Sequence, residues 1–232
     1  MSDFEREHHR RIARVLQALD GPLLSSHGCL FGGGTAIALR YGEYRESIDI
    51  DFLVSHLPGY RALRQLLTGP GGLNAVARTG HNLEQAREMR ADQYGLRTLV
   101  RVDDALIKLE VVHEARITLD PPAADDAVCG IPTLTPLDMV ASKLLANSDG
   151  WADDAVNSRD LIDLAMVVPT LPLLRQALAK AAGAYGDSVR ADLHRALTAL
   201  RQRPQRLDQC LAALSITVPK AVVWTRIRRL AV

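Results

Sequence analysis

Two aspartates stand close together in the stretch FGGGTAIALRYGEYRESIDIDFLV, residues 31–54. Asp49 and Asp51 are two residues apart in an alternating apolar segment that predicts a strand, so we expect both carboxylates on one face, with Cα atoms about 7 Å apart. Such oxygens suit Mg²⁺, which takes one or two carboxylates and completes its shell with water and substrate phosphates. The alternative is an edge strand with a solvated acidic face.

The glycines of the same stretch offer a second kind of chemistry. Gly33, Gly34 and Thr35 follow an apolar run at 27–31 and precede a predicted helix. Backbone N–H groups at a helix start bind phosphate, the glycines allow a close approach, and Thr35 adds a hydroxyl. The stretch matches neither the P-loop nor the G-x-G-x-x-G pattern. A tight turn between strand and helix, with no ligand, is the alternative.

Three further residues could complete such a site. Arg45 and Ser47 precede the aspartates and could contact phosphate or hold the loop. In the run ALIKLEVVHEA, residues 105–115, Glu110 is the carboxylate in the middle of a predicted strand. We therefore take Glu110 as the candidate third metal ligand, although a surface glutamate paired with a cross-strand cation would show the same pattern.

A separate group of charges lies in the C-terminal part. Lys143 is at the edge of an apolar helix face, and Asp160 and Asp163 are one turn apart on the next predicted helix. A lysine point charge suits a triphosphate. A surface lysine and an acidic first turn that complements the helix dipole are the alternative.

The elements that position these residues change character along the chain. The patterns predict, in order, a helix at 4–19 that ends at an Asp20-Gly21-Pro22 turn, a strand at 27–31, a helix from Thr35, a strand at 48–54, a helix opened by Pro58, and two strands joined at Asp103-Asp104. The loop-rich segment 120–132 is the predicted boundary, and everything from Thr135 onward is predicted helical, with Ser158 as the predicted cap of one of these helices. We therefore predict a mixed α/β (α+β) domain at 1–130 and a helical domain at 131–232.

Composition limits the classes of function. Lys and Arg number 28 against 27 Asp and Glu, so the net charge of +1 gives no overall basic field for nucleic acid. RNA would need a local basic patch, and the most basic stretches are RQRPQR and WTRIRR. Three cysteines without Cys-x-x-Cys spacing fit a reducing compartment. No apolar run approaches a membrane span, and the polar start lacks a signal-peptide core. We expect a cytoplasmic protein with no membrane contact.

Taken together, these motifs resemble a known family. The matching residues are Gly33-Gly34-Thr35, Arg45-x-Ser47-x-Asp49-x-Asp51-Phe52, Lys143, and Arg159-Asp160-x-x-Asp163-Leu164. Their order and spacing, from about residue 31 to about 165, resemble the AbiEii/AbiGii-type nucleotidyltransferases, which include the MenT-like toxins of toxin–antitoxin pairs.

The resemblance implies a polymerase-β-like nucleotidyltransferase core followed by a helical domain. It implies that the glycine turn, Gly33 to Thr35, and the pair Asp49 and Asp51 hold a nucleoside triphosphate and its Mg²⁺. It also implies transfer of a nucleoside monophosphate to an acceptor hydroxyl, with the 3′ end of tRNA as the expected acceptor and a cognate antitoxin as a partner.

The resemblance extends to the helical part. It implies that Lys143 lies near the nucleotide phosphates and that Asp160 or Asp163 acts near the attacking hydroxyl. The sequence departs from the family pattern at Asn157, where a basic residue is common, and at Glu110, where polymerase-β folds more often have aspartate. A protein or small-molecule acceptor, or a catalytically silent partner-binding module, are the alternative functions.

Overall fold

The computed structural model describes residues 4–231, and the chain divides into two compact units. Unit 1 comprises Met1–Arg40 and Ser47–Thr135, and unit 2 comprises Tyr41–Glu46 and Pro136–Val232. The sequence-based boundary was placed at residue 130, ahead of this division. Periodicity gave no indication that six residues from the first fifth of the chain pack with the helical part.

Unit 1 carries all the strands of the described chain. Its elements are α1 (Glu7–Ala18), α2 (Gly21–Ser26), β1 (Leu30–Gly32), α3 (Gly33–Arg40), β2 (Ile50–Val54), α4 (Leu57–Thr68), the 3₁₀ helix η1 (Gly72–Val76), β3 (Glu84–Gln85), β4 (Arg90–Ala91), β5 (Gly95–Val102), β6 (Ala105–His113), β7 (Ala127–Val128) and β8 (Ile131–Pro132). The predicted hairpin across Asp103-Asp104 is confirmed, because Val102 pairs with Ala105 in β5 and β6.

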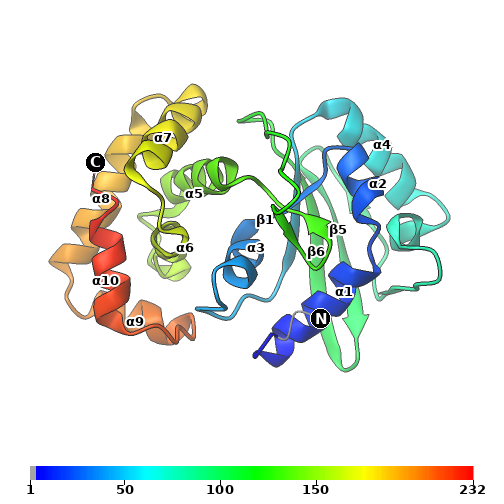
Figure 1. The fold of residues 1–232 in the computed structure, drawn as a ribbon, viewed down its shortest axis with the longest axis horizontal. Helices are drawn as coiled ribbons and strands as arrows, with labels where there is room; N and C mark the ends of the chain where they lie inside the picture. Colours follow the sequence, from blue (N-terminus) through cyan, green and yellow to red (C-terminus); the bar gives the residue numbers. More distant parts are fainter. Residues whose placement is uncertain (1–3, 232) are drawn as a thin grey trace. The chain divides into compact units, whose positions relative to one another are not determined.

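The main sheet, whose strands β1, β5 and β6 are labelled in Figure 1, has the strand order β1-β2-β6-β5-β3, with β4 also pairing on β5. Strands β1 and β2 are antiparallel, β2 and β6 are parallel, and β5 and β6 are antiparallel. The registers align Gly32, Asp51, Glu110 and Arg97 in one row across four strands. Because paired residues project from the same face of a sheet, Asp51 and Glu110 lie on one face as cross-strand neighbours.

Two predicted boundaries around the glycines and aspartates are different in the structure. Strand β2 begins at Ile50, so Asp49 lies just ahead of the strand and Ile48 is 57% exposed. The helix begins at Gly33 instead of Thr35. Gly33 has a positive φ of 68°, which turns the chain sharply enough for the helix to start directly after β1.

The sequence patterns missed helix α2 and the two strands β7 and β8. The segment Asp20-Gly21-Pro22, predicted as a turn, opens α2, and the Asp20 carboxylate accepts the Leu23 N–H at 2.9 Å. An N-cap aspartate followed by a proline is also a helix start signal. The prediction took these residues as the end of the first helix, whereas they also begin the next one. The predicted boundary loop contains the β7–β8 hairpin.

Unit 2 is helical apart from its connections. Its elements are α5 (Pro136–Gly150), the 3₁₀ helix η2 (Asp154–Val156), α6 (Arg159–Val167), α7 (Leu171–Tyr185), α8 (Ser188–Gln202), α9 (Arg206–Ala213) and α10 (Lys220–Arg228). Helix α5 packs against α6, α7 and α8, so it is the centre of this unit. The predicted α+β fold with a helical C-terminal part is confirmed.

The predicted side-chain cap at Ser158 is wrong. Ser158 and Asn157 both have left-handed backbone, with φ of 50° and 52°, and the Ser158 side chain makes no cap hydrogen bond. A capping residue needs an extended backbone to aim its oxygen at the first turn, and these values prevent it. The start of α5 at Pro136 agrees with the sequence prediction.

Candidate functional site

Gly33 brings the start of α3 against the Asp51 carboxylate in unit 1. A Cβ built on Gly33 would lie 2.5 Å from Asp51 Oδ2, which is closer than real Cβ atoms approach. The glycine is therefore required both by its positive φ and by the carboxylate beside it. Gly34 follows in the first turn of the helix and is half-buried.

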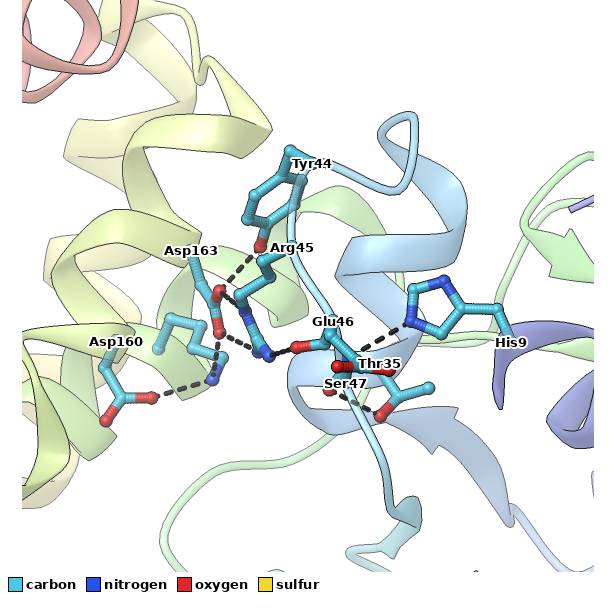
Figure 2. Close-up of polar contacts among 9 residues, drawn as sticks. His9, Thr35, Tyr44, Arg45, Glu46, Ser47, Asp160 and Asp163 are labelled. Carbon is cyan, nitrogen blue, oxygen red and sulfur yellow. Dashed lines mark hydrogen bonds and ion pairs between the residues drawn. The ribbon is translucent and has the colours of Figure 1, made fainter. Parts of the chain in front are cut away.

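Thr35 and Ser47 support the backbone that carries Asp49. The Thr35 hydroxyl donates to the Asp49 carbonyl oxygen at 2.5 Å. It is also hydrogen bonded to the Ser47 hydroxyl at 2.7 Å (Figure 2). Both side chains are buried. Their hydroxyls, predicted to contact a nucleotide, are here used to hold the segment that leads into β2.

A buried histidine that the sequence analysis did not single out joins this support. The Ser47 backbone N–H donates to His9 Nε2 at 3.1 Å, and His9 is fully buried (Figure 2). The acceptor nitrogen must be unprotonated, so the ring is held in one hydrogen-bonding state there. The signal was present in the sequence, because His9 is three residues before Ile12 on the apolar face of α1.

Glu110, predicted as a third metal ligand, is held by two cations. Its carboxylate accepts from the Arg97 guanidinium and from Lys108 Nζ, the latter at 2.5 Å. Burial raises the pKa of Glu110, but the hydrogen bonds from Lys108 and Arg97 outweigh it and lower the pKa overall. The carboxylate is therefore charged and lies next to Asp51 in the sheet.

Lys108 brings positive charge to all three carboxylates. Its pKa is raised, chiefly by the hydrogen bond to Glu110 and further by the charges of Asp49 and Asp51. Lys108 is two residues before Glu110, on the same side of the strand, and the sequence pattern alone gave it no role. The structure gives it one, because its ammonium offsets the repulsion of closely spaced carboxylates.

The acidic residues of unit 1 fit a cation that brings ligands of its own. Within residues 4–231, no group of three or more His, Cys, Asp or Glu side chains is arranged to hold a metal ion. Asp49 and Asp51 nevertheless supply the one or two carboxylates that Mg²⁺ takes from proteins when substrate phosphates complete its shell. The donor set therefore fits a cation bound together with a triphosphate.

In unit 2, Asp163 is the centre of a buried ion network (Figure 2). It accepts from Tyr44 Oη at 2.6 Å, from Arg45 Nε at 2.7 Å and Nη2 at 3.0 Å, and it lies 2.8 Å from Lys143 Nζ. Lys143 also donates to Asp160 Oδ1 at 2.7 Å. Two cations and two carboxylates thus balance in charge.

The network keeps its charges in spite of burial. Burial alone would raise the pKa of the fully buried Asp163, but Lys143 and Arg45 lower it far below its usual range. Burial would lower the pKa of Lys143, but the charges of Asp163 and Asp160 raise it overall. Both groups are therefore ionised near neutral pH.

The structure thus sorts the predicted site residues into two sets. Unit 1 brings together Gly33, Thr35, Ser47, Asp49, Asp51 and Glu110, and unit 2 brings together Arg45, Lys143, Asp160 and Asp163. In the second set, both oxygens of Asp163 are in hydrogen bonds, whereas the Asp160 side chain keeps 12% exposure. Tyr44, like His9, was missed, because its partner lies more than a hundred residues away.

Comparison with known proteins gives a family match and two structural matches. Residues 14–224 match the family model described as "Nucleotidyl transferase AbiEii toxin, Type IV TA system". One solved structure, described as a candidate nucleotidyltransferase from H. pylori, is 18% identical with a TM-score of 0.47, covering 96% of this chain and 93% of its own. JHP933 from Helicobacter pylori is also 18% identical, with a TM-score of 0.44 over 96% of this chain and 90% of its own. No curated protein matches the sequence.

No helix among the described residues is long and apolar enough to cross a membrane.

Proposed function

The chain belongs to the AbiEii family of nucleotidyl transferase toxins, and from that membership we propose that it is a Mg²⁺-dependent enzyme that transfers a nucleoside monophosphate to the 3′ end of tRNA. The observation that carries the proposal is the contact between Gly33 and Asp51, which sets a helix start beside a carboxylate. A helix start favours phosphate and a carboxylate favours a cation, so together they suit a metal–triphosphate.

Residues of unit 1 would bind and orient the triphosphate. Asp49 and Asp51 would hold Mg²⁺, which when bound supplies charge neutralisation on the phosphate oxygens. The N–H groups at the start of α3, from Gly33 and Gly34, would hydrogen bond to phosphate. Glu110 is proposed to keep the site's charge balance through Lys108, and to become a metal ligand only if Lys108 moves away.

Residues of unit 2 are proposed to have unequal roles. Asp163, Arg45 and Tyr44 hold the helical unit together through their buried contacts. Asp160, as the partly exposed carboxylate beside Lys143, is the member proposed to act near the acceptor hydroxyl, with Lys143 toward phosphate. In the reaction, the acceptor oxygen forms a bond to the α-phosphorus, its proton passes to the Asp160 carboxylate, and the bond between the α-phosphorus and pyrophosphate breaks.

Label transfer tests the proposal. The purified protein is incubated with each α-labelled nucleoside triphosphate, Mg²⁺ and total tRNA, and the product is analysed for labelled tRNA, labelled protein and pyrophosphate. We expect label on tRNA, and a loss of at least about 100-fold for Asp49→Asn or Asp51→Asn, because several kcal/mol of charge stabilisation is removed. The matched control is Asp125→Asn, an exposed carboxylate of the same unit, which should keep the rate.

The other outcomes identify the alternatives. Label on protein, or pyrophosphate without label on either polymer, would replace the tRNA acceptor by a protein or a small molecule. No transfer and no calorimetric binding of Mg²⁺ with a non-hydrolysable triphosphate would favour a silent binding module. The toxin role further predicts a cognate antitoxin that relieves growth arrest. With tRNA and a nucleoside triphosphate as substrates, the reaction is proposed to take place in the cytoplasm.

A further inference from the structure

Helices α8 and α10 of unit 2 are drawn in orange and red in Figure 1. Residues of these two helices line a cavity of about 380 Å³. Its walls include Trp224, Arg228 and Ile227 from α10, and His194, Thr198 and Arg201 from α8. The volume is near the lower end of ligand pockets, which span about 300–1,000 Å³. None of the buried ion network of Asp163 lines this cavity, so it is a separate feature of the helical unit.

Within the described part of the chain, the two arginines of this cavity have no acidic partner. Among residues 4–231, the Arg201 side chain has no hydrogen bond or ion pair, and Arg228 contacts only the Thr225 hydroxyl, at 3.4 Å. Elsewhere on α8, Arg195 pairs with the Asp192 carboxylate at 3.0 Å. Two guanidinium groups without a carboxylate are therefore available to an anion at this place.

The distribution of charge along the sequence agrees with this. Residues 209–232 hold four basic and no acidic residues, so the rest of the chain carries 24 basic against 27 acidic residues. The net charge of +1 is therefore the sum of a basic segment at 209–232 and a mildly acidic remainder of the chain. Helix α10, which forms one wall of the cavity, lies in this basic segment.

We propose that this cavity binds one unstacked nucleotide of a single-stranded RNA segment, with its base on the Trp224 indole and its phosphates on Arg201 and Arg228. Indole faces stack on any base, and arginine forks bind phosphate oxygens in pairs. An acidic peptide would use the arginines but would leave the indole without a matching group. The proposal deepens the proposed function, because it gives the RNA acceptor a binding site outside the residues of the transfer chemistry.

Fluorescence anisotropy with a labelled eight-nucleotide single-stranded RNA measures the binding. We expect Trp224→Leu to raise Kd about 5- to 150-fold, the range for losing one base stack. We expect Arg201→Gln combined with Arg228→Gln to raise Kd and to lower the slope of log K against log salt by about 1.4, since two phosphate contacts are lost. The matched control is Arg190→Gln on the same helix, with less than a two-fold change expected.

A second readout reports the cavity directly. The protein has two tryptophans, so a Trp151→Phe background leaves Trp224 as the sole indole. We expect RNA to quench its emission, an abasic oligonucleotide of equal length to bind without that quench, and thermal melts of all variants to stay close to wild type.

The proposal would be overturned by the absence of Trp224 quenching, by equal affinity for the abasic strand, or by an octaglutamate peptide that competes as well as RNA. A mononucleotide triphosphate that binds as tightly as the oligonucleotide would also overturn it, because the cavity would then be a nucleotide site and not an RNA site. If the wild type transfers label and the Trp224 and arginine variants bind RNA unchanged, the cavity is rejected as an RNA site while the proposed function stands. RNA binding at the cavity without label transfer would support the cavity as an RNA site and reject the proposed function.

Discussion

At the scale of single residues, the decisive feature is how little space surrounds the Asp51 carboxylate. Gly33 approaches from one side, and Glu110 with its attached Lys108 stands on the neighbouring strand. The orientation of the Asp51 carboxylate is therefore restricted on the side that faces Gly33. Gly33 is therefore important because it has no side chain. A side chain at this position would displace Asp51, a proposed metal ligand.

Gly33→Ala tests this role. At a φ of 68° an alanine costs about 1–2 kcal/mol, and its Cβ would lie 2.5 Å from Asp51 Oδ2, so the carboxylate must shift. We expect label transfer to fall by far more than the modest loss of stability explains. Transfer rates and thermal melts measured on the same preparations check it.

The control for Gly33→Ala is Gly183→Ala. Gly183 lies within α7, and a Cβ added there meets no atom within 4 Å. We expect this change to raise stability by about 0.5–1 kcal/mol and to leave transfer unchanged. Wild-type transfer by Gly33→Ala would contradict the importance of the close contact.

At the scale of elements, α5 and α6 are joined by charge as well as by apolar packing. Lys143 from α5 bridges Asp160 and Asp163, which are one turn apart on α6. A buried ion pair is costly to form, but removing one partner costs about 3–5 kcal/mol because the other charge is left buried. The arrangement fixes the rotation of α6 about its axis, since only one face presents the two carboxylates.

The pH dependence of stability is expected to report Asp163. Because its pKa is lowered in the folded state from 3.8, its stabilising effect is complete above about pH 4 and is lost as the pH falls further. Asp163→Asn should lower the free energy of unfolding by about 3–5 kcal/mol at pH 7, and the difference from wild type should shrink below pH 4. Denaturant titrations at several pH values check it.

Asp160→Asn is the matched variant for this experiment. Asp160 makes one contact to Lys143 and is partly exposed, so its removal should cost clearly less stability than Asp163→Asn. At the same time it should impair transfer if Asp160 acts near the acceptor. Equal loss of stability in both variants would contradict the different roles given to the two aspartates.

At the scale of the whole molecule, the chain order does not follow the division into units. The segment Tyr41–Glu46 belongs to unit 2, although the residues on both sides belong to unit 1. It carries Tyr44 and Arg45, the two partners that reach Asp163 from a distant part of the sequence. Unit 2 is therefore incomplete without a piece of the N-terminal half.

Two arginines five residues apart allow the contribution of this segment to the stability of unit 2 to be measured. Arg45 is in the Asp163 network of unit 2, whereas Arg40 pairs with Asp126 in unit 1. Both tryptophans, Trp151 and Trp224, are in unit 2, so their fluorescence reports its unfolding. We expect Arg45→Met to lower the urea midpoint of that signal by at least about 1 M.

Arg40→Met provides the comparison. The same chemical change in unit 1 should shift the tryptophan midpoint much less than Arg45→Met does. Equal shifts would mean that the two units unfold as one, and that the assignment of Tyr41–Glu46 to unit 2 has no separate energetic consequence.

The sequence by itself determined the order of the motifs and the class of fold. The family resemblance, confirmed by the match over residues 14–224, followed from the order and spacing of these motifs, and the α+β organisation followed from patterns that repeat within a few residues. Glycine turns, alternating strands and helical periodicity depend on neighbours along the chain, so they can be recognised without a tertiary structure. The same is true of the hairpin at Asp103.

Only the tertiary structure decided which side chains the predicted site residues contact. Arg45 and Asp163 are 118 residues apart and form a buried bidentate pair, and Ser47 is held by His9 instead of standing free. Strand register gave Glu110 its neighbour Asp51, and the fold supplied its cations. Ion pairs and hydrogen bonds between distant segments depend on how elements pack, and no local pattern specifies that packing.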